Sequence, residues 1–345
     1  MSEKRITQQD IARKAGVHRA TVSMALKHHP RIPAATRERI LQLAEELGYR
    51  PDPMLSALAT YRSGQQKHTY QGTLAWLVVH REDIDLKWRE IDTYRLYYEG
   101  AQHRADKYGY KVEVFELGHN KLSPKRLASM LKARNINGIL LCPQPNPWVS
   151  MDFPWSDFSL ITFGYTLLKP KLHTVTSTQY RAMVQTMTEM HKAGYRRIAF
   201  VFDFAQDAKA DHNFLAGYLV AQQQIGQPPM LIDYQWRDLK GFKERIEGMR
   251  PEAIVTGDFK IHQRTAEIGI RIPEDLPVAC VALNSLDSEL TGICENSFHI
   301  GEIAVERLAN MIAHGERGVP ELVQRTHIEG QWVPGKTLPQ LSQPS

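Results

Sequence analysis

The sequence predicts a small all-α helix-turn-helix head with a hinge helix, followed by a larger α/β domain of two doubly wound parallel-sheet subdomains. Residues 5–61 contain short helical patterns separated by turn residues, and the later chain alternates apolar strand runs with helices of crossover length. A short polar stretch, residues 63–68, lies between these regions. We therefore predict a head at 1–50, a hinge helix and linker at 51–70, a large domain at 71–335 and a tail at 336–345.

The first helix of the head is predicted to begin after Thr7. Thr7 and Asp10 have the spacing of a capping box, in which a hydroxyl and a carboxylate satisfy the free N–H groups at a helix start. Ile11 and Ala15 lie on one apolar stripe, and Gly16 provides the sharp turn that ends the helix. These features indicate a short amphipathic helix.

A second short helix follows the glycine turn, and Val22, Ala25 and Leu26 give it an apolar face. Two short helices around a tight turn form a helix-turn-helix, whose second helix can enter the major groove of DNA. Residues predicted to face outward near the start of this helix are His18, Arg19, Ala20 and Met24.

The third helix is predicted to follow Pro33, whose fixed φ suits a first helical position, and to end at Gly48. Apolar residues at helical spacing, beginning at Ile40, close the small core of the head. Asp52 and Pro53 then open a hinge segment, MLSALATY. A helix this short is marginal by itself.

Positive charge is concentrated in the head. Residues 1–62 contain eleven Lys or Arg against six Asp or Glu, an excess of five that equals the formal net charge of +5 of the whole chain. Localised positive charge is expected where a protein binds phosphates and releases counterions. A run of charge is more often only a solvated surface, but here it coincides with the helix-turn-helix.

Composition excludes several other classes of protein. Hydrophobic residues at 42% and charged residues at 23% are typical of a globular chain, not a disordered one. No run approaches the ~18 apolar residues of a membrane span, and the N-terminus lacks a secretory pattern. Cys142, Cys280 and Cys294 are far apart, which indicates buried thiols in a reducing compartment. We expect a cytoplasmic protein with no membrane partner.

The large domain is predicted to contain two consecutive blocks of strands and helices. Apolar runs that alternate with helices imply parallel sheets with right-handed crossovers. Two such blocks meet at a cleft, and ligands bind beyond the carboxyl ends of the strands. The predicted order is strand 74–79, helix 90–108, strand 112–117, helix 123–134, strand 138–142, a Pro-rich loop, strand 160–163, helix 178–193, strand 196–202, helix 214–225, strand 253–256, helix 259–269, strand 278–283, helix 301–313 and a strand near 322–327.

Residues 330–337, GQWVPGKT, match the phosphate-loop pattern G-x-x-x-x-G-K-[ST]. Such a loop needs a helix directly after it to hold phosphates, whereas the residues that follow, LPQLSQPS, contain two prolines. We interpret the match as chance, with a phosphate-loop nucleotide hydrolase as the alternative. The motifs G-x-S-x-G, H-E-x-x-H and G-x-G-x-x-G do not occur, and the histidines are scattered. We expect no enzyme, no catalytic residue, no cofactor and no metal site.

The chain resembles the LacI/GalR family of bacterial transcriptional regulators. In the head the resemblance rests on DIARKAGV at 10–17, ATVS at 20–23, TRERI at 36–40 and LGYRPD at 47–52. It continues more weakly through AGYRRIAFV at 193–201, LAGYLVAQQQIG at 215–226, IRIPEDLPV at 270–278 and LTGICEN at 290–296. It implies that residues 71–335 form a periplasmic-binding-protein-like domain for effector binding and dimerisation. The DNA-binding residues that it implies are Thr7, His18, Arg19, Ala20, Thr21, Ser23, Met24, Lys27, Thr36 and Leu58.

Two positions depart from the family's usual polar base-reading side chains, because this chain has Ala20 and Met24 there. Arg19 is therefore the expected hydrogen-bonding reader, to guanine O6 and N7, while Ala20 and Met24 offer apolar contact to thymine methyl groups. The resemblance implies that Leu58, paired with its twin in a dimer, wedges into the minor groove. The alternatives are a three-helix protein-interaction module and, for Met24, simple packing.

The resemblance also places candidate effector residues at strand ends. Asn284 stands where relatives carry an aspartate that binds effector hydroxyls, and Asp258 lies in the equivalent of an Asn-Asp turn. Phe214 replaces a usual arginine, and Glu295 replaces a frequent glutamine, which argues against a familiar sugar effector. Trp88 offers a face on which a ring could stack. The alternatives are ordinary core aromatics for Trp88 and Phe214, and a helix cap for Asp258.

These observations predict a sequence-specific transcriptional regulator, acting as a repressor, whose operator affinity is controlled by a small polar or sugar-like effector in the cleft. The expected partners are a double-stranded operator, a small-molecule effector and a second copy of the chain. A homodimer is expected because the tail has no leucine heptads that would support a tetramer. The alternative is a small-molecule binding module that does not regulate DNA.

Overall fold

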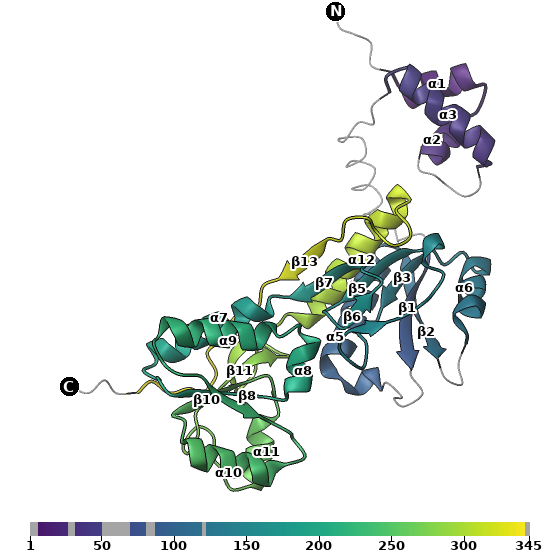
Figure 1. Ribbon diagram of the computed structural model, residues 1–345. Coiled ribbons are helices and arrows are strands. Elements are labelled where there is room, and N and C mark those ends of the chain that lie inside the picture. Colours follow the sequence, from purple (N-terminus) through teal and green to yellow (C-terminus); the bar gives the residue numbers. More distant parts are fainter. Residues whose placement is uncertain (1–5, 27–31, 50–69, 81–86, 119–121, 342–345) are drawn as a thin grey trace, which may run out of the picture.

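We describe a computed structural model of the chain over residues 6–26, 32–49, 70–80, 87–118 and 122–341. It contains a helical head and two α/β subdomains, each built on a six-stranded sheet (Figure 1). In these ranges no helix is long and apolar enough to cross a membrane. The predicted hinge segment and the linker at 63–68 lie outside the described residues.

The head consists of α1 (Gln8–Ala15), α2 (Arg19–Leu26) and α3 (Ala34–Glu46). As predicted, Thr7 precedes α1, where the Asp10 carboxylate accepts hydrogen bonds from the Thr7 N–H at 2.9 Å and from its hydroxyl at 2.7 Å. Gly16 ends α1 with φ of 65°, a conformation that favours glycine. The third helix follows Pro33 as predicted, and Pro33, with a ψ of 142°, is the residue before the helix rather than its first helical residue. The buried core is Ile11, Ala12, Ala15, Val22, Ala25, Ile32, Ile40 and Ala44.

The first subdomain has the strand order β13-β7-β5-β3-β1-β2, and its strands pair in parallel. Side chains of β1 alternate between the faces of the sheet, as expected for a strand covered on both sides. Trp76 packs with helices α5 and α12, and Leu77 packs with α6. The elements are β1 (Gly72–His80), α5 (Asp92–Lys107), β2 (Tyr110–Gly118), α6 (Pro124–Ala133), β3 (Gly138–Leu141), β5 (Ser159–Phe163), β7 (His173–Ser177), α12 (Ser297–His314) and β13 (Arg325–Ile328).

The second subdomain has the strand order β14-β12-β11-β10-β8-β9, and only β14 pairs antiparallel among these described strands. Phe200 of β8 packs on the side of α7 and α9, and Val201 packs on the side of α10 and α11. The elements are α7 (Gln179–Lys192), β8 (Ile198–Phe202), α8 (Phe204–Lys209), α9 (Asn213–Gln224), β9 (Met230–Asp233), α10 (Leu239–Met249), β10 (Ala253–Thr256), α11 (Ile261–Glu267), β11 (Val278–Leu283), β12 (Thr291–Cys294) and β14 (Gln331–Val333).

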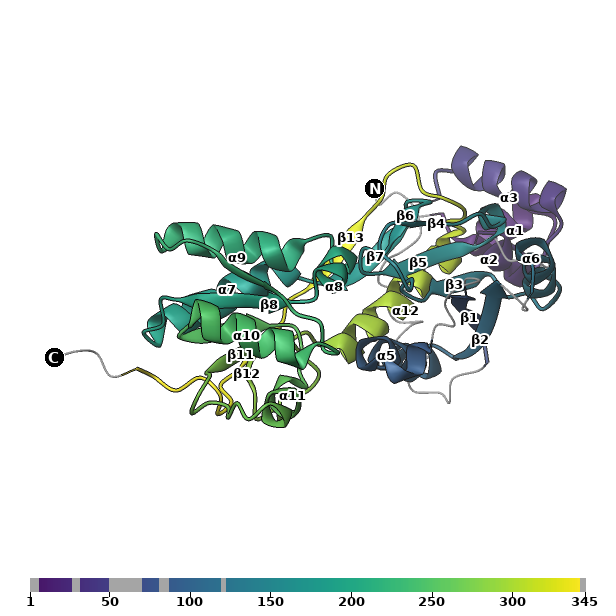
Figure 2. The same cartoon turned by 60° about the horizontal axis from the view of Figure 1, so that its bottom comes forward.

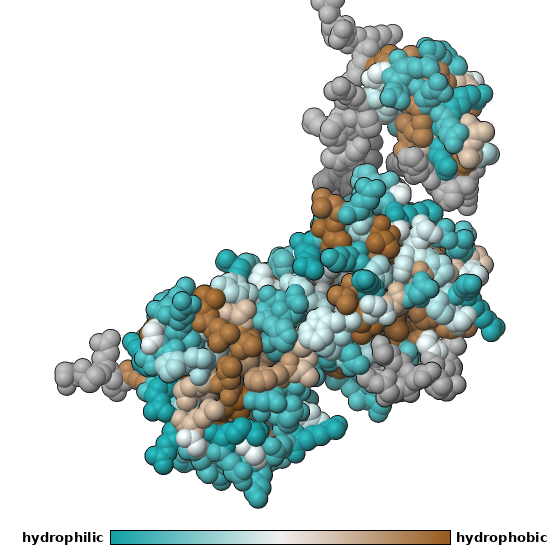
Figure 3. All heavy atoms as spheres, viewed as in Figure 1, coloured by the Kyte–Doolittle hydropathy of each residue, from teal (hydrophilic) through white to brown (hydrophobic). Residues whose placement is uncertain are grey.

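The described chain passes between the two sheets after β7, after β12 and after β13. Residues 297–328 therefore return to the first subdomain, where α12 lies beside α5 (Figure 2). Smaller elements of the first half are η1 (Trp88–Glu90), η2 (Trp155–Asp157) and the paired strands β4 (Val149–Ser150) and β6 (Leu167–Lys169). Figure 3 shows a mostly hydrophilic outer surface with smaller apolar areas.

The predicted strand and helix alternation is present, with three kinds of difference. The sequence did not predict β7, β9, α10, β12 or β14, which are short or carry polar residues. Helix α12 begins at Ser297, before the predicted start at Gly301, and Ser297 and Ile300 in this added turn are already buried in its packing. Strand β13 begins at Arg325, after the predicted start near Leu322, which is 79% exposed.

Candidate DNA interface and ligand cleft

The start of α2 presents the residues that were expected to read base edges. The Ala20 N–H donates to Nδ1 of His18 at 3.3 Å, so the imidazole caps this helix. His18, Arg19 and Ala20 are exposed. An exposed guanidinium at the first turn of a second helix has the placement required for contact with guanine in a major groove.

The other candidate DNA-binding residues have mixed positions. Thr21, Ser23 and Thr36 are half-buried. Met24 was expected to face outward, but it is half-buried and packs against the head core, which favours its alternative role in packing. Lys27 and Leu58 lie outside the described residues. Thr7 caps α1, as described above.

Sequence reasoning missed the role of Arg39 in holding the head together. Its Nη2 donates to the Ala15 carbonyl at 3.1 Å, which satisfies an orphan carbonyl at the end of α1 from a side chain of α3. Arginine on the outer face of a helix is the only sequence signal, and it does not reveal such a contact.

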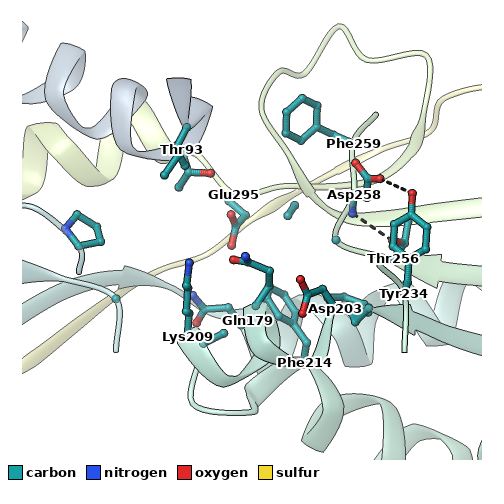
Figure 4. Close-up of a pocket in the computed structure, with 18 of the residues that line it drawn as sticks. Thr93, Gln179, Asp203, Lys209, Phe214, Tyr234, Thr256, Asp258, Phe259 and Glu295 are labelled. Atoms are coloured by element: carbon teal, nitrogen blue, oxygen red, sulfur yellow. Dashed lines mark hydrogen bonds between the residues drawn. The ribbon is translucent and has the colours of Figure 1, made fainter. Parts of the chain in front are cut away.

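A cleft of about 470 Å³ is lined by residues from both subdomains, mostly just beyond the carboxyl ends of strands. The first subdomain contributes residues that follow β3, β5 and β7, and the second contributes residues at the ends of β8, β9, β10 and β12. Figure 4 shows polar side chains from these segments around the cavity. Labelled lining residues are Thr93, Gln179, Asp203, Lys209, Phe214, Tyr234, Thr256, Asp258, Phe259 and Glu295.

Asp258 lies in the cleft and also stabilises the turn before α11. Its carboxylate accepts hydrogen bonds from the Tyr234 hydroxyl at 3.0 Å, from Nη1 of Arg264 at 2.6 Å and from the Lys260 N–H at 3.0 Å. Burial, together with the nearby Asp258 charge, raises the pKa of Tyr234 to about 12, so the phenol stays a proton donor. Asp258 therefore stabilises the turn before α11 but is not the N-cap of that helix, which is Lys260, and its role in effector binding stays a prediction.

Glu295 is a buried carboxyl group at the base of the cleft. The Ser177 hydroxyl donates to its Oε1 at 2.5 Å. Burial raises the pKa of Glu295 above its usual range, although the Ser177 hydrogen bond opposes that shift. Gln179 lies in the same region, and its Nε2 donates to Thr176 Oγ1 at 3.2 Å.

A third acidic residue of the cleft, Asp203, lies at one end of the short helix α8, and Lys209 lies at the other end. Asp203 caps α8 by accepting from the Ala205 N–H at 2.9 Å. Burial lowers the pKa of Lys209, and the Asp203 charge partly offsets this effect. Both residues line the cleft.

Aromatic side chains form much of the apolar wall of the cleft. Phe214 lines it and packs against Phe202, with 5.3 Å between ring centroids. Trp88 is buried against Trp76 and Tyr98 and is not among the residues that line this cleft, which favours its alternative as a core aromatic.

Asn284 was also expected to reach an effector. It follows β11 and is half-buried, but the lining residue contributed by this strand is Ala282. The structure thus brings together Phe214, Asp258 and Glu295 from the candidate set. Gln179, Asp203, Lys209, Tyr234 and Arg264 were missed. Gln179, Asp203 and Tyr234 lie just after strand ends, but β7 and β9 were themselves not predicted, and Lys209 and Arg264 lie within the helices α8 and α11.

The phosphate-loop match at 330–337 has a structural role. The Thr337 hydroxyl donates to the Val278 carbonyl at 2.8 Å, and its Oγ1 accepts from the Thr291 N–H at 2.9 Å. Residues 334–341, up to the end of the described chain, contain no helix that could hold a phosphate. In the described part of the chain, no group of three His, Cys, Asp or Glu residues could hold a metal ion.

Comparison with known proteins agrees with this architecture. The family model for bacterial regulatory proteins of the lacI family matches residues 7–52, and the periplasmic binding protein-like domain matches residues 187–338. The repressor CytR of Escherichia coli is 23% identical over 324 residues, covering 88% of this chain and 89% of CytR. The NTD biosynthesis operon regulator NtdR of Bacillus subtilis is 24% identical, covering 79% of this chain and 81% of NtdR.

Two solved structures share the fold. The lac repressor dimer bound to operator and the anti-inducer ONPF has a TM-score of 0.54 at 17% identity, covering 97% of this chain and 100% of that one. The complex of the transcriptional regulator CelR with cellobiose has a TM-score of 0.56 at 19% identity, covering 96% and 100%. The fold and the two matched domains define a DNA-binding transcriptional regulator with an effector-binding domain. The head, residues 7–52, matches the lacI family of bacterial regulatory proteins, and the chain is similar over most of its length to transcription regulators.

Proposed function

We propose that this protein represses transcription by binding an operator as a homodimer, and that a small polar molecule in the cleft changes its operator affinity. The observation that carries this proposal is the presence, in one chain, of an exposed Arg19 at the start of α2 and a polar cleft between two subdomains. We place the protein in the cytoplasm, where its DNA lies. The proposed domain boundaries are those predicted from the sequence, with the head at 1–50, the hinge helix and linker at 51–70, the large domain at 71–335 and the tail at 336–345.

Operator recognition is assigned to the head. Arg19 would donate to guanine, and Ala20 would contact a thymine methyl group. The proposed set of DNA contacts also includes Thr7, His18, Thr21, Ser23, Lys27, Thr36 and Leu58, with Met24 contributing mainly to packing. The excess of five positive charges over residues 1–62 supports phosphate contacts.

The effector is proposed to be a small polar or sugar-like molecule. A volume of about 470 Å³ lies within the range of roughly 300–1,000 Å³ typical of small-molecule sites. Phe214 would provide an apolar surface, while Asp258 and Glu295 would receive hydrogen bonds from the ligand. The CelR complex, which has the same fold, contains cellobiose.

Signal transfer to the head would follow a change in the relative position of the subdomains. They are joined where the chain passes between the sheets, and the rings of Trp148 and His212, one from each subdomain, have centroids 5.9 Å apart. A ligand that binds one arrangement more tightly shifts the population toward it. Such a shift would alter how two heads are presented to one operator.

Selection of bound fragments from random DNA, with and without a panel of cellular metabolites, tests this proposal. We expect a pseudo-palindromic site whose half-sites lie about one helical turn apart, and a metabolite that changes the affinity. Binding of a metabolite without any selected DNA would instead support a small-molecule binding module. Failure to select DNA and to bind any metabolite would refute both.

A further inference from the structure

Two neighbouring polar side chains at the base of the cleft keep hydrogen-bonding capacity that the described residues do not use. Gln179 and Glu295 line the cleft, and each is only 8% exposed. Gln179 Oε1 has no hydrogen-bond partner among the described residues. A buried acceptor without a donor is costly, and a bound molecule can supply the missing donor. Figure 4 shows the Gln179 amide directed toward Glu295 and the cavity.

Glu295 differs from the other two carboxyl groups of the cleft in its surroundings. Asp258 forms an ion pair with Arg264 at 2.6 Å, and Asp203 interacts electrostatically with Lys209. In the described part of the chain, Glu295 forms no ion pair and accepts one hydrogen bond, from the neutral Ser177 hydroxyl. The cleft therefore contains one buried carboxyl group that forms no ion pair with any of the described residues.

Resting on the proposed function of the cleft, we propose that Gln179 and Glu295 form a subsite for a primary ammonium group, and that the effector is a small hydroxylated amine. The ammonium would donate hydrogen bonds to Gln179 Oε1 and Glu295 Oε2 and would supply the missing positive charge. A charged hydrogen bond of this kind is stronger than a neutral one. The remaining hydroxyl groups of the ligand would face the other polar side chains of the cleft.

The rest of the cleft fits such a molecule. Three aromatic residues line it, namely Tyr94, Tyr97 and Phe214. The face of an aromatic ring attracts a cation and also packs against apolar groups. Lys209 also lines the cleft, where the negative charge of Asp203 raises the pKa of Lys209 against the larger lowering effect of burial. Ser177 precedes α7 and Glu295 precedes α12, so the subsite lies where the chain passes between the subdomains.

Matched pairs of amines and alcohols test the subsite on the full chain. The probes are glucosamine with glucose, galactosamine with galactose, and ethanolamine with ethylene glycol, each titrated calorimetrically. We expect the amine of at least one pair to bind about tenfold more tightly than its alcohol. Glu295→Gln keeps an acceptor for the Ser177 hydroxyl and should abolish this preference.

Glu289→Gln is the matched control, since Glu289 is exposed and lies outside the cleft, and it should retain the preference. The preference should also weaken as the pH is lowered, because burial raises the pKa of Glu295 and protonation then removes its charge. The proposal is overturned if no amine binds more tightly than its alcohol, or if the preference survives Glu295→Gln.

These outcomes separate the subsite from the function of the cleft. If alcohols bind and change operator affinity while amines bind no better, the cleft is an effector site and the ammonium subsite is refuted. If no compound of these pairs or of a wider metabolite panel binds or alters operator affinity, both proposals fail.

Discussion

Arg264 of α11 donates a hydrogen bond to the Asp258 carboxylate, with 2.6 Å between Nη1 and Oδ2. The two side chains are 26% and 13% exposed, so water only partly screens their charges. The same carboxylate accepts a hydrogen bond from Tyr234, which lies beyond the end of β9. The Asp258 carboxylate therefore connects three parts of the cleft wall in the second subdomain: the end of β9, the turn after β10 and helix α11.

Replacing Arg264 with Ala should destabilise the protein because Asp258 would lose its cation while remaining largely buried. We expect a loss of about 2 kcal/mol in the free energy of unfolding, measured by urea denaturation. Arg271→Ala is the control, since Arg271 pairs with Asp275 at the surface, where solvent screens the pair, and it should leave the free energy of unfolding almost unchanged. Equal losses in both variants would contradict the structural role of the Asp258 pair.

Arg19→Ala should reduce specific operator affinity by roughly 1 to 3 kcal/mol and relax the preference at one base position. The reason is loss of the guanidinium that is proposed to contact guanine O6 and N7. Selection from random DNA, followed by titration of the preferred site, measures both effects. Arg317→Ala removes an exposed arginine that follows the C-terminal end of α12. This control should change neither the operator affinity nor the base preference. An unaltered base preference in Arg19→Ala would reject the assignment of this reader.

Acid should destabilise the packing of α5 against α12 through Glu302. Burial tends to raise the pKa of Glu302, but hydrogen bonds from His299 and His103 and the charge of Arg104 outweigh this effect and lower it to about 2. A pKa below the usual value of 4.5 contributes stability above pH 4.5 that is lost as the pH falls toward 2. The expected loss is on the order of 3 kcal/mol. Urea denaturation at several pH values should show a weaker acid dependence in Glu302→Gln.

Gly301→Ala should disrupt the same helix pair by steric overlap. A Cβ at Gly301 would clash with the Tyr97 carbonyl oxygen, and a Cβ at Gly100 would clash with the Phe298 carbonyl oxygen, so the backbones approach closely from both sides. We expect a loss of at least about 1 to 3 kcal/mol in the free energy of unfolding. Gly248→Ala, at an open position in α10, is the control and should be neutral or slightly stabilising. A neutral Gly301→Ala would show that these helices can separate without cost.

The elements that sequence reasoning predicted well carry a strong local signal. The capping box at Thr7, the glycine after α1 and the apolar run of β1 each depend on nearby residues alone. Strand β7 has no such signal, because its sequence, HTVTS, is polar yet fully buried. Its burial depends on partners distant in sequence, such as the Gln324 N–H that donates to His173 Nδ1 at 3.0 Å.

The difference between local sequence signals and contacts distant in sequence also explains why only part of the cleft was predicted. Asp258 and Glu295 were found because a strand end and a family resemblance both pointed to them. Gln179 was missed because the strand before it was missed, and Lys209 was missed because α8 is a short helix with no clear pattern. Trp88 and Asn284 are not among the residues that line the cleft, because nearness to a strand end or a crossover does not specify which side chains reach the cavity.

The return of residues 297–328 to the first sheet has a consequence for biosynthesis. Until α12 and β13 have emerged from the ribosome, the side of β1 that carries Trp76 lacks one of its covering helices, and β7 lacks a neighbour. A nascent chain that ends before residue 297 would expose this apolar surface. The first subdomain can therefore mature only after nearly the entire polypeptide has been translated, although its sheet begins at Gly72.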